Sequence, residues 1–138
     1  DYFGIYEHFG LTGPGAIFGH AIHLTERERT AISQSGSAIA HCPTSNTFIG
    51  SGLFDMQGLR DCPRPVIVGL ATDVAGGSSM SMFDVMRTAY EISQLRGYSL
   101  HPAKAWYLAI VGSAKATAGL SLACHLRPGP FPDCSSTS

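Results

Sequence analysis

Short apolar runs alternate with amphipathic segments along the chain. Three runs, at 16–24, 37–42 and 66–71, are predicted to form strands because they are short, apolar and bounded by turn residues. The third run, VIVGLA, is apolar throughout, a pattern typical of a strand that is covered on both faces. Single helical segments separate the runs, so we expect neighbouring strands to be parallel and joined by right-handed crossovers.

The helical segments have recognisable starts and stops. Helices are predicted at 1–10, 25–35, 51–61, 81–95 and 102–119. Thr25 and Glu28 have the spacing of a capping box, and Gly36 suits the C-terminal stop of the same helix. The segment 43–52, PTSNTFIGSG, is rich in turn-forming residues and is expected to be a loop.

The predicted fold class is α/β, but three parallel strands are few for a complete sheet. Both outer strands would expose apolar edges, which finished folds avoid. The composition agrees: 44% of residues are hydrophobic and 14% charged, against about 25% charged in a typical globular domain. We therefore expect the chain to be a portion of a larger sheet or barrel.

Charge and hydropathy exclude some classes of partner. The net charge of −1 gives no electrostatic basis for binding nucleic acid or an anionic membrane. No apolar run approaches the roughly 18 residues of a membrane span, and the first residues lack the pattern of a secretion signal. The cysteines form no CxxC pair, and we expect reduced thiols in a cytoplasmic protein at Cys42, Cys62, Cys124 and Cys134.

Polar residues follow each predicted strand. His20 comes after the first strand, His41 and Cys42 after the second, and Asp73 after the third. In parallel α/β proteins, sites form where the carboxyl ends of the strands meet, so these side chains are candidates for one site. Asp73 could instead cap the following helix, but Ser81 is itself a suitable cap, which favours a functional carboxylate.

The other histidines have simpler interpretations. We interpret His41 as a structural residue in a loop-bracing network, in which Asn46 bonds nearby backbone. His101 precedes Pro102 and is interpreted as part of a helix start. No role is assigned to His8 or His125.

Three motifs carry a family resemblance. FGHAIHL (18–24), AHCPTSN (40–46) and GLATDVAGG (69–77), in this order, resemble the last third of the catalytic barrel of the guanine deaminase family, within the amidohydrolase superfamily. The resemblance implies a partial TIM-like (β/α)8 barrel in which residues 1–120 contribute strands six to eight and a C-terminal helix. Residues 121–138 depart from the family pattern and are expected to be a disordered or aberrant tail, because prolines at alternate positions oppose a paired strand.

The resemblance also implies residue roles. His20 matches a histidine that faces the substrate and the zinc-bound water, and Asp73 matches an aspartate that is both zinc ligand and proton carrier. The implied cofactor is one Zn²⁺ per complete site, and the implied reaction is hydrolysis of guanine to xanthine and ammonia. The full-length enzyme is expected to be a homodimer.

Two motifs of the family do not occur in this chain. The HxH pair and the HxxE stretch, which supply further zinc ligands and a general-acid Glu, are absent, and His20 with His23 does not replace them. We therefore expect the chain alone to be inactive, since zinc needs three or four protein ligands. Two alternatives remain: an amidohydrolase deaminase of another aminated heterocycle, such as a triazine or cytosine, or a non-catalytic remnant or interaction fragment. The signature of Cys-ligated nucleobase deaminases is absent.

Overall fold

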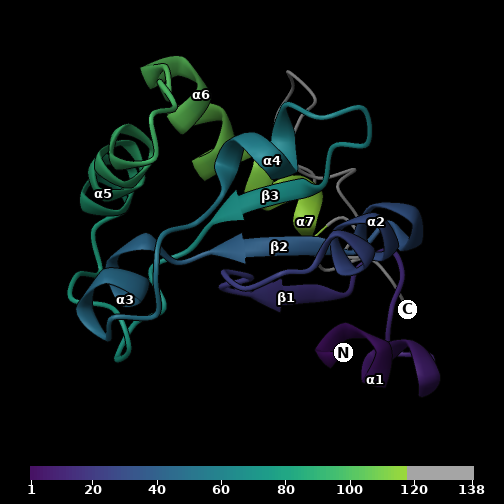
Figure 1. Ribbon diagram of the computed structural model, residues 1–138. Helices are drawn as coiled ribbons and strands as arrows, with labels where there is room; N and C mark the ends of the chain where they lie inside the picture. Colours follow the sequence, from purple (N-terminus) through teal and green to yellow (C-terminus); the bar gives the residue numbers. More distant parts are fainter. Residues whose placement is uncertain (118–138) are drawn as a thin grey trace, which may run out of the picture.

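The computed structural model describes residues 1–117, and the tail predicted at 121–138 lies outside the described residues. Within this part of the chain, a parallel sheet has the strand order β1-β2-β3. Its strands are β1 (Ile17–Gly19), β2 (Ala38–His41) and β3 (Ile67–Leu70). Phe18 pairs with Ile39 and Ile39 with Val68, so the three strands lie in register (Figure 1). The predicted parallel α/β arrangement is confirmed.

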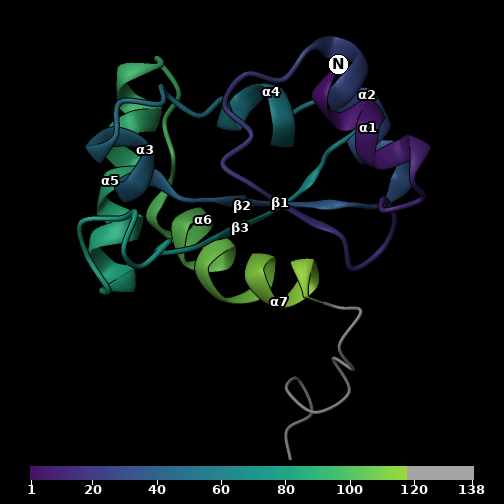
Figure 2. The same ribbon diagram turned by 90° about the horizontal axis from the view of Figure 1, so that it is seen from below.

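Helical segments connect and follow the strands. They are α1 (Tyr2–His8), α2 (Glu26–Ser35), α3 (Pro43–Phe48), α4 (Met56–Arg60), α5 (Met82–Leu95), α6 (Pro102–Tyr107), the π-helical segment η1 (Leu108–Gly112) and α7 (Ser113–Ala116). Seen along the sheet, α2 and α4 lie on one side and α6 to α7 on the other (Figure 2). The helix predicted at 102–119 is confirmed over 102–116 as one helical stretch with a π-helical turn in its middle, and positions 118–119 lie outside the described residues.

The capping box of α2 forms as predicted. The Thr25 side chain accepts from the Glu28 amide, and a Glu28 carboxylate oxygen accepts from the Thr25 amide at 2.9 Å. The other oxygen of Glu28 accepts from the Phe3 amide at 3.0 Å and so ties α1 to α2. Hydrogen bonds from the backbone amides of Thr25 and Phe3 lower the pKa of Glu28 to about 2.

The first strand is shorter than the predicted 16–24. His20 and Ala21 have φ angles of 66° and 51°, and this left-handed backbone cannot continue a strand. The strand therefore ends at Gly19.

Two predictions for the segment after β2 are wrong. Residues 43–48 form helix α3 rather than a loop, because Pro43 suits a first helical position and the next three residues are buried by tertiary packing. The helix predicted at 51–61 begins only at Met56, since Gly52 has a φ of 121° and the Asp55 side chain caps α4 at the Gly58 amide.

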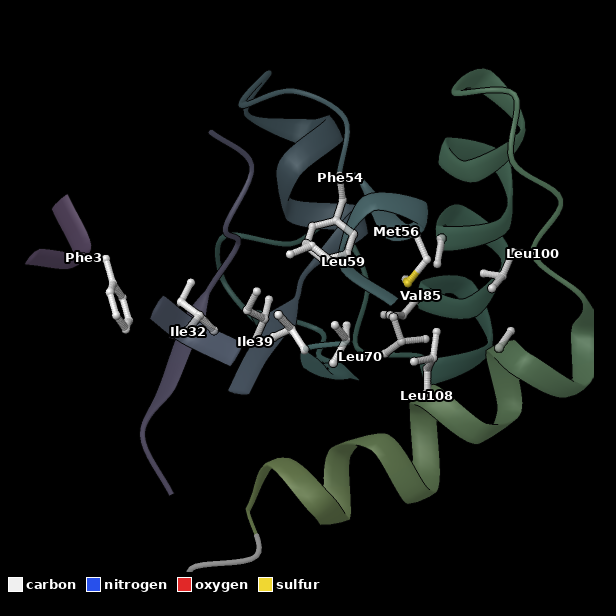
Figure 3. Close-up of a cluster of buried hydrophobic side chains, with 14 residues drawn as sticks. Phe3, Ile32, Ile39, Phe54, Met56, Leu59, Leu70, Val85, Leu100 and Leu108 are labelled. Atoms are coloured by element: carbon white, nitrogen blue, oxygen red, sulfur yellow. The ribbon is translucent and has the colours of Figure 1, made fainter. Parts of the chain in front are cut away.

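The core joins the sheet to the helices on both sides. Figure 3 shows side chains of α2, α4 and α5 gathered around the strands, with Leu108 of η1 beyond them. Gly69 of β3 is required by close packing, since a Cβ there would lie 2.8 Å from the Ser113 Cα. Coverage of β3 on both faces is confirmed, whereas Ile17 of β1 remains 42% exposed. No helix in the described part of the chain is long and apolar enough to cross a membrane.

Candidate functional site

The carboxyl ends of β1 and β3 bring two candidate residues together. His20 follows the last residue of β1, and Asp73 lies three residues beyond β3. The His20 Nε2 atom lies 3.7 Å from the Asp73 Oδ2 atom. Their side chains are 41% and 36% exposed, so a small molecule can reach both. The two residues that the sequence nominated as catalytic therefore share one site at the predicted edge of the sheet.

Both residues have a strained backbone. The φ angle is 66° at His20 and 48° at Asp73, in the left-handed region that non-glycine residues rarely adopt. Such a conformation costs about 1–2 kcal/mol per residue, and residues of this kind cluster at functional sites. After Asp73 the chain folds back sharply, because the amides of Gly76 and Gly77 both donate to the Asp73 carbonyl oxygen. The left-handed backbone at His20 and Asp73 therefore lowers the stability of the fold while it sets the positions of these two side chains.

Cys42 supplies a third donor atom beside this pair. One ligand atom each of His20, Cys42 and Asp73 lies within 4.8 Å of the others. Burial, and then the charge of Asp73, raise the pKa of the Cys42 thiol above its ordinary value. Its Sγ donates to the Ala40 carbonyl oxygen at 3.5 Å. The sequence placed Cys42 among the candidate residues at the strand ends, and the structure brings its Sγ atom to the pair of His20 and Asp73.

Helix α3 contributes two hydrogen bonds that hold segments of the site in place. Its Asn46 is completely buried, and the Asn46 Oδ1 atom lies 2.7 Å from the His20 Nδ1 atom. The Thr44 hydroxyl donates to the carbonyl oxygen of Thr72, the residue before Asp73, at 3.4 Å. The expectation that the Asn46 side chain bonds nearby backbone is wrong: it bonds a histidine 26 positions away. This partner lies far away in the sequence, and no local pattern around Asn46 indicates it.

His41 is buried in the core of the fold. Its side chain is 1% exposed and stacks on Phe54, with ring centroids 4.1 Å apart and an interplanar angle of 14°. Burial, and then the nearby His20, lower the pKa of His41 to about 3, so the ring is neutral at physiological pH. Its Nδ1 atom has no hydrogen-bond partner within residues 1–117. His41 is structural, as predicted, but it acts through stacking and not through a hydrogen-bonded brace.

The remaining described histidines have local contacts. His23 Nε2 lies 2.9 Å from the Ser51 carbonyl oxygen and ties the loop after β1 to the segment before α4. His101 Nδ1 accepts from the Ala103 amide at 3.1 Å, which confirms its place at a helix start. His8 lies in the last turn of α1, and His125 lies outside the described residues.

A pocket adjoins the site along the outer strand. It has a volume of about 700 Å³, and its lining includes Phe18, His20 and Glu28. Within the described residues, β1 pairs with β2 alone, so the far edge of β1 is free. The pocket and the free edge together form an apolar surface next to the His20 ring.

His20 and Asp73 are chemically suitable zinc ligands, but two ligands are fewer than a zinc site needs. Imidazole nitrogen and carboxylate oxygen are ordinary zinc ligands, and ligand bonds of 2.0–2.2 Å in a tetrahedron put two ligand atoms about 3.3–3.6 Å apart. The 3.7 Å between His20 and Asp73 is close to that separation. Zinc needs at least three protein ligands in catalytic sites, so His20 and Asp73 alone are too few to hold it tightly.

Comparisons with known proteins identify the family and several relatives. The sequence profile of the amidohydrolase family matches residues 3–116. The guanine deaminase of Escherichia coli (strain K12) is 39% identical over 132 residues, which cover 96% of this chain but 30% of that relative. The chain thus spans about a third of the length of this curated relative.

Solved structures of deaminases also match the fold of this chain. The E. coli guanine deaminase structure matches with a TM-score of 0.82 and 40% identity, over 85% of this chain and 27% of that one. A guanine deaminase from C. acetobutylicum with bound guanine matches with a TM-score of 0.75 and 28% identity, over 83% and 29% of the two chains. An adenosine deaminase from Xanthomonas campestris with bound zinc matches at 0.76 and 26%, over 84% and 27%.

Proposed function

Because the chain belongs to the amidohydrolase family, we propose that it contributes strands six to eight of the barrel of a zinc-dependent guanine deaminase. One observation carries this proposal: His20 and Asp73, each on strained backbone, face one another at the carboxyl edge of the sheet. The similarity to guanine deaminases over most of the chain supplies the substrate. The barrel portion predicted for residues 1–120 and the homodimer of the full-length enzyme remain parts of this proposal.

The proposed reaction is hydrolysis of a C–N bond. The oxygen of water adds to C2 of guanine, the bond from C2 to the exocyclic nitrogen breaks, and xanthine and ammonia are formed. Bound zinc supplies the Lewis acidity that makes water a nucleophile at neutral pH. Within this chain, Asp73 is the ligand residue, and His20 lies beside it.

Asp73 and His20 have different proposed roles, one in proton transfer and the other in charge stabilisation. The Asp73 carboxylate accepts a proton from the attacking water and returns it to the departing nitrogen, as a general base and then a general acid. The His20 imidazole orients the water and stabilises the charge that develops at the ring being attacked. Both side chains are more than a third exposed, which leaves room for a planar heterocycle beside them.

The proposed site needs ligands from outside this chain. His20 and Asp73 are too few to hold zinc tightly, and the free edge of β1 with its apolar pocket is a natural place for further strands to pack. We therefore propose that residues 1–138 alone release no ammonia from guanine. A cytoplasmic location for the enzyme is also part of this proposal.

A second candidate is supported by one structural relative. The adenosine deaminase from X. campestris shares 26% identity with this chain, so a deaminase of another aminated heterocycle is the alternative substrate class. Both candidates use the same two residues and differ in the ring that is bound. A non-catalytic remnant is the third possibility, and it predicts no activity under any condition.

A chimera tests the proposal. Residues 3–116 replace the matching segment of the E. coli guanine deaminase, and ammonia release is measured from guanine, adenosine, cytosine and an aminotriazine. We expect guanine to be the preferred substrate and Asp73→Asn to abolish turnover. The matched control is Asp61→Asn, which changes another carboxylate, paired with Lys104 on the surface, and should retain activity. A folded chimera without deaminase activity supports the remnant, and preference for another ring supports the second candidate.

A further inference from the structure

Asn46 is held in an unusual position for an asparagine. It is 0% exposed, it lies inside the six-residue helix α3, and its side-chain oxygen is 2.7 Å from His20 Nδ1. Asparagine is a poor residue for a helix interior, because its side chain competes for backbone hydrogen bonds. Helix formation therefore does not explain the choice of this residue.

The side-chain amide of Asn46 also has an unsatisfied hydrogen-bond donor. The Asn46 Nδ2 atom is buried and has no hydrogen-bond partner within the described part of the chain. A buried donor without a partner lowers stability, so an apolar residue of similar size would make a more stable helix. Only the Oδ1 end of the side chain is engaged, and its partner is the ring of His20.

We infer that Asn46 is a positioning residue that fixes the tautomer and the orientation of His20. The His20 Nδ1–H donates to Asn46 Oδ1, and the unprotonated Nε2 then faces Asp73 across 3.7 Å. A histidine that serves a metal or a water through one ring nitrogen commonly donates its other N–H to an oxygen, which sets the tautomer. The catalytic consequence of this role rests on the proposed function; the tautomer itself does not.

Helix α3 is suited to this task because it contacts both halves of the site. Pro43 fixes its first turn, and the Thr44 hydroxyl bonds the carbonyl oxygen of Thr72, next to Asp73. Asn46, one turn along the same helix, bonds His20. One short rigid element therefore sets the position of the imidazole relative to the carboxylate.

The strained backbone at His20 makes such support necessary. The left-handed φ of 66° ends the strand at this residue, and although the His20 amide still donates to the Ala40 carbonyl oxygen, the His20 side chain is 41% exposed. Without the bond to Asn46, the imidazole would be free to rotate in solvent and to take the other tautomer. The hydrogen bond to Asn46 orients this exposed ring.

The tautomer can be read by NMR on the full chain of residues 1–138. With ¹⁵N-labelled histidine, and at a pH well above the ordinary histidine pKa of about 6.5, we expect His20 to be protonated at Nδ1. Asn46→Leu, close in size but unable to accept, should shift His20 toward protonation at Nε2. Asn46→Asp, which keeps an acceptor and loses the donor, should restore the Nδ1–H signature. Ser45→Ala is the matched control, since its buried hydroxyl makes no hydrogen bond within residues 1–117.

Two results would overturn the inference. One is a wild-type His20 that is protonated at Nε2, and this reading does not depend on whether any variant folds. The other is a folded Asn46→Leu variant whose His20 signature is unchanged.

Activity in the chimera separates this inference from the proposed function. Asn46→Leu is expected to lower kcat by about 10–100-fold with little change in KM, as loss of a supporting hydrogen bond does at such sites, and Asn46→Asp should recover part of it. An inactive wild-type chimera, with the NMR shifts as expected, rejects the proposed function and leaves the positioning role. An active chimera in which Asn46→Leu keeps full kcat rejects the catalytic importance of Asn46.

Discussion

The ends of β1 and β2 each carry a histidine, one strand apart in the same parallel sheet, in opposite surroundings. His20 is 41% exposed at its side chain, bonds Asn46 and faces Asp73. His41 is 1% exposed and stacks on Phe54. The same residue type at the same edge of the sheet therefore belongs to a candidate site in one strand and to the core in the next.

The backbone explains the difference. His41 is still part of β2, where side chains alternate, so it lies on the same face as the fully buried Ile39. His20 comes after β1 has ended, and its φ of 66° turns the side chain out of that alternation. Because β2 includes His41, that side chain packs into the core. Because β1 ends before His20, that side chain lies beside the neighbouring loops.

The largest expected effect concerns activity. In the chimera, His20→Ala should lower kcat/KM by about 10²–10⁴-fold, the range for loss of a positioned acid–base or charge-stabilising group. His41→Phe, which keeps an aromatic ring against Phe54, should change kcat/KM far less. Steady-state ammonia release from guanine measures both. Equal losses in the two variants would contradict the division between the two strand ends.

A second prediction concerns stability and pH. His41 has a pKa of about 3 in the folded chain, below the value of about 6.5 for an unfolded histidine, so the unfolded state binds more protons between these values. The stability contributed by neutral His41 is present above pH 6.5 and is lost as the pH falls toward 3. Between pH 7 and pH 4 the loss should be about 3 kcal/mol, from the size of this shift.

Chemical denaturation of residues 1–138 at several pH values measures this loss. His41→Phe should flatten the dependence, whereas His20→Phe should leave most of it. Glu28 also titrates below its ordinary pKa, but both variants retain it, so the comparison isolates His41. An unchanged pH dependence in His41→Phe would show that His41 is not buried in its neutral form.

The smallest expected effect concerns backbone strain. His20→Gly and His20→Ala both lose the bond to Asn46, but only glycine relieves the left-handed conformation. The glycine variant should therefore be more stable than the alanine variant by up to about 1 kcal/mol, even though glycine adds freedom to the unfolded state. His41 has no such strain, so His41→Gly should be no more stable than His41→Ala. Denaturant midpoints of the four variants give the two differences. A His20→Gly variant that is less stable than His20→Ala would mean that the strain is not stored at His20.

Local sequence patterns were enough to predict the parallel strands, the capping box of α2 and the proximity of His20 to Asp73. These features depend on local periodicity, on a spacing of three residues and on the rule that carboxyl ends of parallel strands share an edge. The buried β3 was predicted for the same reason, since its run VIVGLA is apolar at every position.

Features set by tertiary contacts were missed. Helix α3 has the composition of a loop, and the burial of Pro43, Thr44, Ser45 and Asn46 by tertiary packing favours the helix. The bond between Asn46 and His20 spans 26 positions, and nothing in the local sequence marks it. The early end of β1 depends on positive φ angles at His20 and Ala21, which these residue types seldom adopt.

The zinc content of the chimera tests the central claim most directly. That claim is that Asp73, with His20 beside it, belongs to a metal site that other segments complete. We predict about one zinc per purified chain in the wild-type chimera and a large loss in Asp73→Ala, whereas Asp61→Ala retains the metal. An Asp73→Ala chimera that holds as much zinc as wild type and turns over guanine at the same rate would contradict the account.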